Sequence, residues 1–151
     1  CVLTNANGGF GEIMMSDTWL ERHTNQDILT QARGDVLLAG LGIGLVPSGI
    51  IDKVNTLIVI ELEPDVIKLV ETPLRQYLGK KADILTILQA DIFQYEPTQK
   101  FDVIYFDIWQ HISGDNYEAT KILHKRFRKW LKPNGWMGSW MRDEFRRLNK
   151  E

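Results

Sequence analysis

The stretch that decides the fold reads DVLLAGLGIG and spans residues 35–44. Its first part, residues 36–39, is a short apolar run, which is typical of a strand buried on both faces of a parallel sheet. Gly40, Gly42 and Gly44 follow directly and lead into a segment that can form a helix. Glycines at such a junction let the backbone come close to a ligand, and the start of the helix offers free N–H groups. The stretch therefore predicts a ligand-binding turn between a strand and a helix.

Four more runs of strand type follow, and segments with helical spacing separate them. They occupy residues 57–60, 84–88, 101–106 and 135–140, and a turn at residues 132–135 precedes the last run. Strands that alternate with helices indicate a parallel α/β sheet. We expect a Rossmann-like, doubly wound α/β fold with a mainly parallel sheet of about five strands, in the order 3-2-1-4-5, and flanking helices.

Two amphipathic helices are expected within this fold. The first begins at Pro64, and its apolar positions are Val66, Ile67, Val70, Leu74 and Tyr77. Pro73 should kink or interrupt this helix. The second begins near Asn116, and its apolar stripe comprises Ala119, Ile122, Leu123, Phe127, Trp130 and Leu131. The basic residues expected to face away from the core are Lys121, Lys125, Arg128, Lys129 and Lys132.

The first 34 residues are expected to form an extension of the main domain. Residues 13–15 and 19–20 flank a Ser-Asp-Thr turn, which predicts a small hairpin, and a helix is expected near residues 25–32. The domain division is therefore 1–34 for a hairpin and helix extension and 35–151 for the Rossmann-like ligand-binding domain.

Composition excludes several classes of protein. The 151 residues are 44% hydrophobic and 25% charged, as in ordinary globular domains, and no apolar run approaches the roughly 18 residues that span a bilayer. The lone Cys1 excludes an internal disulfide, and no leader-like segment opens the chain, so we expect a cytoplasmic protein without a membrane partner. The three histidines, His23, His111 and His124, show no ligand spacing, so no metal site is expected.

Charge is divided unevenly along the chain. There are 8 basic and 17 acidic residues through Thr120, against 10 basic and 3 acidic residues from Lys121 onward. The acidic part argues against a nucleic-acid partner. We interpret the basic part as a solvated helix face, with an acidic or polynucleotide substrate as the alternative.

Acidic residues follow the later strands. Glu61 ends the second run, 21 residues after Gly40, which is about the spacing at which nucleotide-binding folds place an acid for the ribose hydroxyls. Asp91 and Asp107 follow the third and fourth runs. The GxGxG spacing lacks the third-glycine position of a pyrophosphate-binding turn, and the acids suit a cationic sulfonium better than a dianion. The alternative is that the glycines form only a tight turn and the acids only cap helices.

Four segments resemble class I S-adenosylmethionine-dependent methyltransferases, in the order and spacing of that family. Residues 35–44 resemble the first motif, and residues 60–67 (IELEPDVI) resemble the ribose motif, particularly the version found in spermidine synthases. Residues 89–93 (QADIF) are similar to the segment whose aspartate binds the adenine amino group. Residues 101–107 (FDVIYFD) are similar to the strand that reaches the reaction centre.

The resemblance implies S-adenosyl-L-methionine as the cofactor and gives each matching residue a role. Glu61 would hold the ribose hydroxyls and Asp91 the adenine edge, with Leu62 and Ile92 as apolar walls. The residues that would line the methionine and ribose portion are Gly40, Gly42 and Gly44.

Residues 107–111 (DIWQH) are the candidate acceptor side of the site. The resemblance implies that Asp107 lies beside the sulfonium and the acceptor, where a carboxylate can position or deprotonate an amine or a hydroxyl. Trp109 is a candidate wall for a flat or cationic acceptor, and His111 is a candidate base. The alternatives are loop capping by Asp107, core packing by Trp109 and a plain loop position for His111.

The sequence thus predicts an S-adenosylmethionine-dependent methyltransferase that acts on a small-molecule acceptor. One alternative is an aminopropyltransferase of the spermidine-synthase type, although Gln110 stands where those enzymes have a second acid. The other alternative is a non-catalytic binder of adenosyl ligands.

The last predicted strand, residues 135–140, should lie at an exposed edge of the sheet. Trp136 and Trp140 on this edge predict a surface for self-association, and a homo-oligomer is the resulting expectation. The alternative is that both tryptophans pack under the flanking helices.

Overall fold

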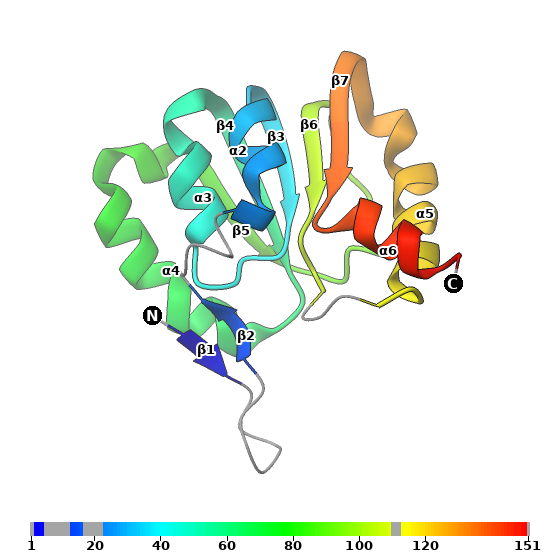
Figure 1. The fold of residues 1–151 in the computed structure, drawn as a ribbon. Coiled ribbons are helices and arrows are strands. Elements are labelled where there is room, and N and C mark those ends of the chain that lie inside the picture. Colours follow the sequence, from blue (N-terminus) through cyan, green and yellow to red (C-terminus); the bar gives the residue numbers. More distant parts are fainter. Residues whose placement is uncertain (1, 5–12, 17–22, 110–112, 151) are drawn as a thin grey trace.

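The computed structural model describes residues 2–4, 13–16, 23–109 and 113–150 (Figure 1). Its centre is a parallel sheet of five strands, listed here in chain order: β3 (Gly34–Ala39), β4 (Val54–Glu61), β5 (Leu85–Gln89), β6 (Phe101–Phe106) and β7 (Leu131–Ser139). The order across the sheet is β5-β4-β3-β6-β7, and every neighbouring pair is parallel. The predicted Rossmann-like order 3-2-1-4-5 is confirmed.

Helices cover both faces of this sheet (Figure 1). One face packs against α2 (Gln26–Gln31), α3 (Leu45–Ile50), α4 (Pro64–Leu78) and α6 (Arg142–Leu148). The other face packs against α5 (Asn116–Phe127). Short 3-10 turns follow three of the helices, at Ile51–Lys53, Gly79–Ile84 and Arg128–Trp130. The central strands β3 and β6 have few polar positions because side chains of alternating residues enter two separate cores.

Helix α4 is not interrupted at Pro73, and its apolar face differs from the expected one. It runs without interruption from Pro64 to Leu78, with Pro73 inside it. Pro73 lies on the exposed side, where water can bind the backbone carbonyl that a proline leaves without a partner. Tyr77 is 79% exposed, and Leu78 is the buried residue of the last turn. The apolar face is therefore displaced by one residue at its end, as 3.6 residues per turn allows.

Helix α5 has a different buried face from the predicted one. Ile122 is exposed, whereas Thr120 and His124 are buried beside Leu123 and Phe127. The His124 Nε2 atom lies 2.7 Å from the Ser139 Oγ atom, so this hydrogen bond joins α5 to the end of β7. Burial, assisted by nearby arginines, lowers the pKa of His124 to about 4.

The N-terminal segment contains an antiparallel pair of strands, as expected, but the described pair is not the predicted one. Strand β1 (Val2–Thr4) pairs antiparallel with β2 (Ile13–Ser16), and residues 19–20, the predicted partner, lie outside the described residues. The helix expected near residues 25–32 is confirmed as α2. Ile28 of α2 is buried in the core of the main sheet, and the Tyr105 hydroxyl donates a hydrogen bond of 3.1 Å to Asn25 Oδ1.

Strand β7 begins earlier than expected, at Leu131, so the predicted turn at residues 132–135 lies inside it. Between its pairs with Phe101 and Val103, β7 has three more residues than β6, and Asn134 there has a φ of 63°. A bulge of this kind lets a turn-like sequence stay within a strand.

The two tryptophans of β7 and its end pack against other parts of the chain. Trp136 stacks on Tyr105 with ring centroids 6.1 Å apart, and the Trp140 Nε1 atom donates a hydrogen bond of 3.0 Å to Thr24 Oγ1. These contacts favour the packing alternative for both side chains. Strand β7 is nonetheless at the edge of the five-stranded sheet, and self-association through it stays a prediction.

An ion cluster ties the starts of three strands together. Lys132, which was expected to face away, places its Nζ atom 2.7 Å from Asp35 Oδ2 and 3.0 Å from Asp102 Oδ2. The hydrogen bond from Lys132 lowers the pKa of Asp35, and the backbone N–H of Asp35 lowers that of Asp102. The lysine therefore links β7 to β3 and β6 through two ionised carboxylates.

Replacing this lysine should destabilise the fold in a pH-dependent way. A carboxyl whose pKa is lowered by folding stabilises the protein above its unfolded pKa, about 4, and this stabilisation is lost as the pH falls through the lower, folded pKa. We expect Lys132→Met to lower the urea midpoint of unfolding at pH 7 and to differ much less from the parent at pH 3.

Lys81→Met is the matched control, because Lys81 makes an exposed ion pair with Asp52. Its midpoint should change little at either pH. An equal loss for Lys132→Met at both pH values would contradict the electrostatic origin.

Candidate cofactor site

Backbone hydrogen bonds fix the chain just beyond the carboxyl ends of the strands. Gly40 N–H donates to the Ile60 carbonyl at 2.8 Å, and Asp107 N–H donates to the Ala39 carbonyl at 2.8 Å. Ala90 N–H likewise donates to the carbonyl of Glu61 at 3.0 Å. Backbone hydrogen bonds to neighbouring strands therefore fix the residues that follow β3, β5 and β6. The first residue of each of these loops has a defined position.

The turn after β3 requires glycine at position 40. Gly40 has a φ of 101°, and a Cβ atom built on it would overlap the backbone carbonyl oxygen of Asp107. No side chain fits between these two loops. Position 40 thus sets how closely the turn after β3 approaches the chain after β6.

Gly44 has a different place in the structure. It precedes the first residue of α3 with a φ of 83°, and its carbonyl accepts hydrogen bonds from the Ser48 N–H and hydroxyl. A Cβ atom there would lie 3.0 Å from the side chain of Leu74. Gly44 therefore shapes the start of α3 and its contact with α4.

Glu61 connects the glycine turn to the end of β4. Its Oε2 atom accepts a hydrogen bond of 2.8 Å from the Leu41 N–H, and its Oε1 atom accepts one of 3.2 Å from the Glu63 N–H. The carboxylate is thereby oriented before any ligand binds, and each oxygen keeps capacity for a further donor.

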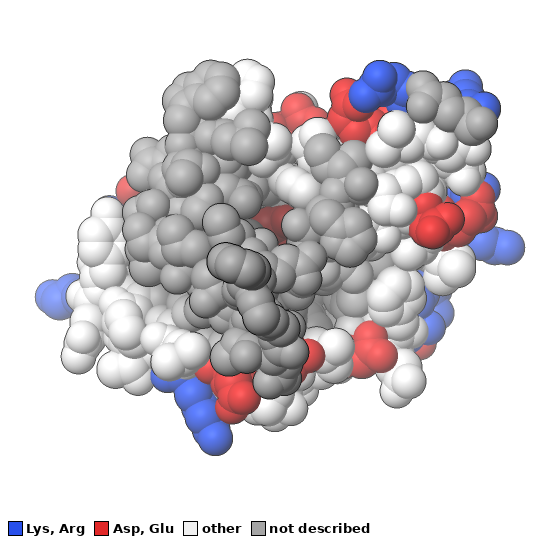
Figure 2. Space-filling view, turned by 60° about the horizontal axis from the view of Figure 1, so that its bottom comes forward, with Lys and Arg blue, Asp and Glu red and all other residues white. Residues whose placement is uncertain are grey.

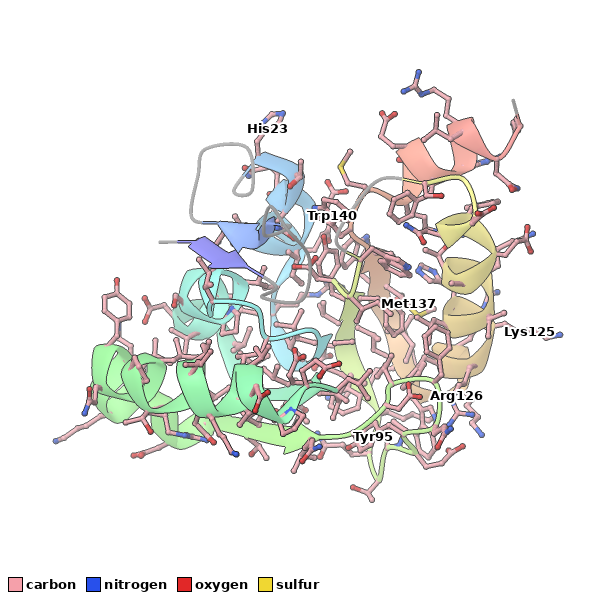
Figure 3. The ribbon with its side chains drawn as sticks, turned by 90° about the horizontal axis from the view of Figure 1, so that it is seen from below. His23, Tyr95, Lys125, Arg126, Met137 and Trp140 are labelled. Atoms are coloured by element: carbon pink, nitrogen blue, oxygen red, sulfur yellow. The ribbon has the colours of Figure 1, made fainter. Side chains whose placement is uncertain are left out.

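Asp91 begins the loop between β5 and β6. Its Oδ1 atom accepts a hydrogen bond of 2.9 Å from the Phe93 N–H, which closes a local turn. The same loop is held further along by Arg126 of α5, whose Nη2 atom lies 2.9 Å from the Tyr95 carbonyl and 3.0 Å from Glu96 Oε1. Figure 3 shows Arg126 beside Tyr95. Helix α5 thus helps to position the loop that carries Asp91.

A cavity of about 360 Å³ lies at these strand ends, and we call it the strand-end cavity. Its lining includes most residues that the sequence singled out, namely Gly40, Gly42, Glu61, Leu62, Asp91, Ile92, Asp107 and Trp109. Gly44 is not among the lining residues, and His111 lies outside the described residues.

The lining also contains residues that were not predicted as site residues, among them Val66 and Phe93. Phe93 is 37% exposed although it is aromatic, and it follows Asp91 by two positions. An aromatic residue so close to a strand-end acid was the available signal. Val66 had been interpreted only as part of the buried face of α4.

The cavity is strongly acidic. Four carboxylates line it, from Glu61, Glu63, Asp91 and Asp107, and the described lining residues include no lysine, arginine or histidine. Asp107 is 8% exposed, so its carboxyl group lies in a largely enclosed position. Figure 2 shows acidic atoms in the middle of this face of the molecule. The site favours a ligand with positive charge near its centre.

Solved methyltransferases have the same fold. N-methyltransferase NodS from Bradyrhizobium japonicum WM9, in complex with S-adenosyl-L-homocysteine, is 18% identical with a TM-score of 0.61, over 81% of this chain and 62% of that chain. The glycopeptide N-methyltransferase MtfA complexed with S-adenosyl-L-methionine is 19% identical with a TM-score of 0.59, over 76% and 51%. An S-adenosylmethionine-dependent methyltransferase from Clostridium acetobutylicum ATCC 824 is 18% identical with a TM-score of 0.59, over 80% and 50%.

These comparisons establish the architecture. The chain has the Rossmann-like fold of class I S-adenosylmethionine-dependent methyltransferases, and it spans between 50% and 62% of the length of the three proteins just described. No protein-family model matches the chain, and no curated protein matches it. Within the described ranges, no helix has the length and apolar character needed to cross a membrane.

Gly40→Ala should disrupt the site. The substitution forces an alanine into a positive φ, at a cost of about 1 kcal/mol, and also into overlap with the Asp107 carbonyl. We expect a lower free energy of unfolding, measured in urea. Gly79→Ala is the matched control, since Gly79 has a φ of 60° with open space around its Cβ position. Equal destabilisation by both variants would exclude a role for the close approach.

Proposed function

We propose that the strand-end cavity binds S-adenosyl-L-methionine and that the protein transfers its methyl group to a small-molecule acceptor. The observation that carries this proposal is one cavity lined by Gly40 of the glycine turn, Glu61 and Asp91. The presence of S-adenosylmethionine or its demethylated product in solved structures of the same fold supports it.

The cofactor roles follow from the positions of the side chains. Glu61 holds the ribose hydroxyls through the lone pairs that the Leu41 and Glu63 N–H groups leave free. Asp91 binds the adenine amino group at the end of β5, between two apolar walls. Leu62 is 56% exposed and Ile92 is buried, so adenine would cover apolar surface that faces water in the free protein.

The methionine portion lies along the glycine turn, in this proposal, at Gly40 and Gly42. Gly44 acts indirectly, because it shapes the start of α3. The Asp107 carboxylate lies near the sulfonium in this arrangement, and its negative charge stabilises the positive charge of that group. Bound S-adenosylmethionine supplies an activated methyl group, so the protein needs mainly to align the acceptor and accept its proton.

Two other functions use the same cavity. Aminopropyl transfer would need decarboxylated S-adenosylmethionine, and no feature of the described residues favours it over methyl transfer. A non-catalytic binder would hold the ligand without turnover. Calorimetry with S-adenosylmethionine, its demethylated product and the decarboxylated form separates these functions when it is combined with an assay for methylated product. A preference for the decarboxylated form would support aminopropyl transfer.

Glu61→Ala should weaken S-adenosylmethionine binding by more than tenfold. The reason is the loss of two charge-assisted hydrogen bonds to the ribose, each worth about 1.5 to 3 kcal/mol. Glu61→Gln, which retains one acceptor oxygen, should lose less. Calorimetry measures the affinities, and urea unfolding of the free variants separates binding from damage to the glycine turn.

The matched control is Glu118→Ala, because Glu118 lies on the surface of α5 and pairs with Lys121. Its affinity for the cofactor should equal that of the parent. An unchanged affinity in Glu61→Ala would reject the ribose assignment.

A further inference from the structure

The wall of the cavity beyond Asp107 is built by two distant parts of the chain. Trp109 lines the cavity, and its ring packs edge-on against Phe145 of α6, with centroids 5.5 Å apart at 72°. Trp140 makes a similar contact with Phe145 at 6.0 Å and 68°. Phe145 is fully buried, so α6 holds the Trp109 ring in one orientation at the edge of the cavity.

The carboxylates of the cavity can serve two different ligands, the cofactor and the methyl acceptor. The Glu61 and Asp91 carboxylates accept backbone N–H groups and serve the nucleoside in the proposed function. Asp107 is the most enclosed of the cavity carboxylates, and it lies two residues before Trp109 in the segment that follows β6. Among the described lining residues, the charged groups on this side of the cavity are therefore negative, and the Trp109 ring lies in the same part of the lining.

This combination disfavours an acidic acceptor. A carboxylate or phosphate placed next to Asp107 would meet like charge in a partly enclosed site, and the described lining offers no cationic side chain to bind it. An organic ammonium group would meet a buried carboxylate and the face or edge of an aromatic ring, which is the combination that recognises amines.

We propose that the methyl acceptor is an amine, which Asp107 binds in its ammonium form and Trp109 covers with its ring. This inference rests on the proposed function. Trp109 selects the acceptor, and Phe145 acts as a positioning residue through Trp109. Helix α6, which is far from the nucleoside-binding loops in the sequence, thereby contributes to acceptor specificity.

The transfer step balances with these groups. The ammonium loses one proton to Asp107, which passes it to water, and the free amine then attacks the methyl carbon. A nitrogen–carbon bond forms while the sulfur–methyl bond breaks, and the electron pair of the broken bond stays on sulfur. The products are S-adenosylhomocysteine and the methylated ammonium. Alignment of the free amine with the methyl group contributes to the rate.

The test measures acceptor binding apart from turnover. The protein is saturated with S-adenosylhomocysteine, and benzylamine, benzyl alcohol and benzoate are titrated at pH 7.5 with ligand-observed NMR. These three probes share one ring and differ in charge. We expect benzylamine to bind at least tenfold more tightly than the alcohol, and benzoate to bind more weakly than either. Equal binding of the three, tighter binding of the alcohol or benzoate, or no binding of the amine would overturn the amine proposal.

Variants assign the effect to the named residues. Asp107→Asn should remove at least tenfold of the preference for amine over alcohol, and Trp109→Leu should weaken both probes. The controls are Asp115→Asn, an exposed position before α5, and Trp130→Leu, a partly buried position that packs against the core after α5. The preference should persist in both controls, and its persistence in Asp107→Asn would contradict the assignment.

The first step of the experiment separates the two proposals. If S-adenosylhomocysteine binds and the amine has no advantage, the acceptor class is wrong while the cofactor proposal stands. If S-adenosylhomocysteine itself does not bind, the proposed function fails before the acceptor is tested.

Discussion

The rest of the structure depends on the close approach between the turn after β3 and the chain after β6. Gly40 has no room for a side chain beside the Asp107 carbonyl, and Asp107 in turn donates its N–H to the end of β3. Glu61 binds the same turn from the side of β4 through the Leu41 N–H. Three neighbouring strands therefore end in one interlocked edge, and the cavity lies on that edge. Its shape is a property of the backbone before any ligand is present.

Much of the fold could be predicted because short apolar runs separated by helical segments allow few topologies. The errors arose where local pattern was ambiguous. Tyr77 and Leu78 are neighbours on α4, and helical spacing alone could not decide which one is buried. Lys132 looked like one more surface cation, since its carboxylate partners come from β3 and β6, far away in the sequence. The pairing of β2 with β1 was also not predicted.

The glycine and the acidic residues of the site were easier to predict than the aromatic residues around them. Gly40, Glu61, Asp91 and Asp107 follow directly from the rule that parallel strands present their carboxyl ends at one edge, and all four line the cavity. Phe93 was missed although it follows Asp91 by two positions, and the Phe145 support of Trp109 could not be found in this way. The Phe145 contact depends on how α6 folds back onto the sheet, which the strand pattern does not encode. Gly44 matched the glycine motif, yet its conformation serves the start of α3.

The two backbone hydrogen bonds to Glu61 also bear on ligands that the site would reject. They hold both carboxylate oxygens in place, so the carboxylate cannot swing away from a group that approaches the ribose position. A nucleoside phosphorylated on either ribose hydroxyl would bring negative charge against this fixed acceptor, and the described cavity lining provides no basic side chain to offset it. With Glu61 at the ribose, as proposed, the cavity would discriminate against cofactors with a ribose phosphate, such as NADP and coenzyme A, because two backbone N–H groups hold this carboxylate in place.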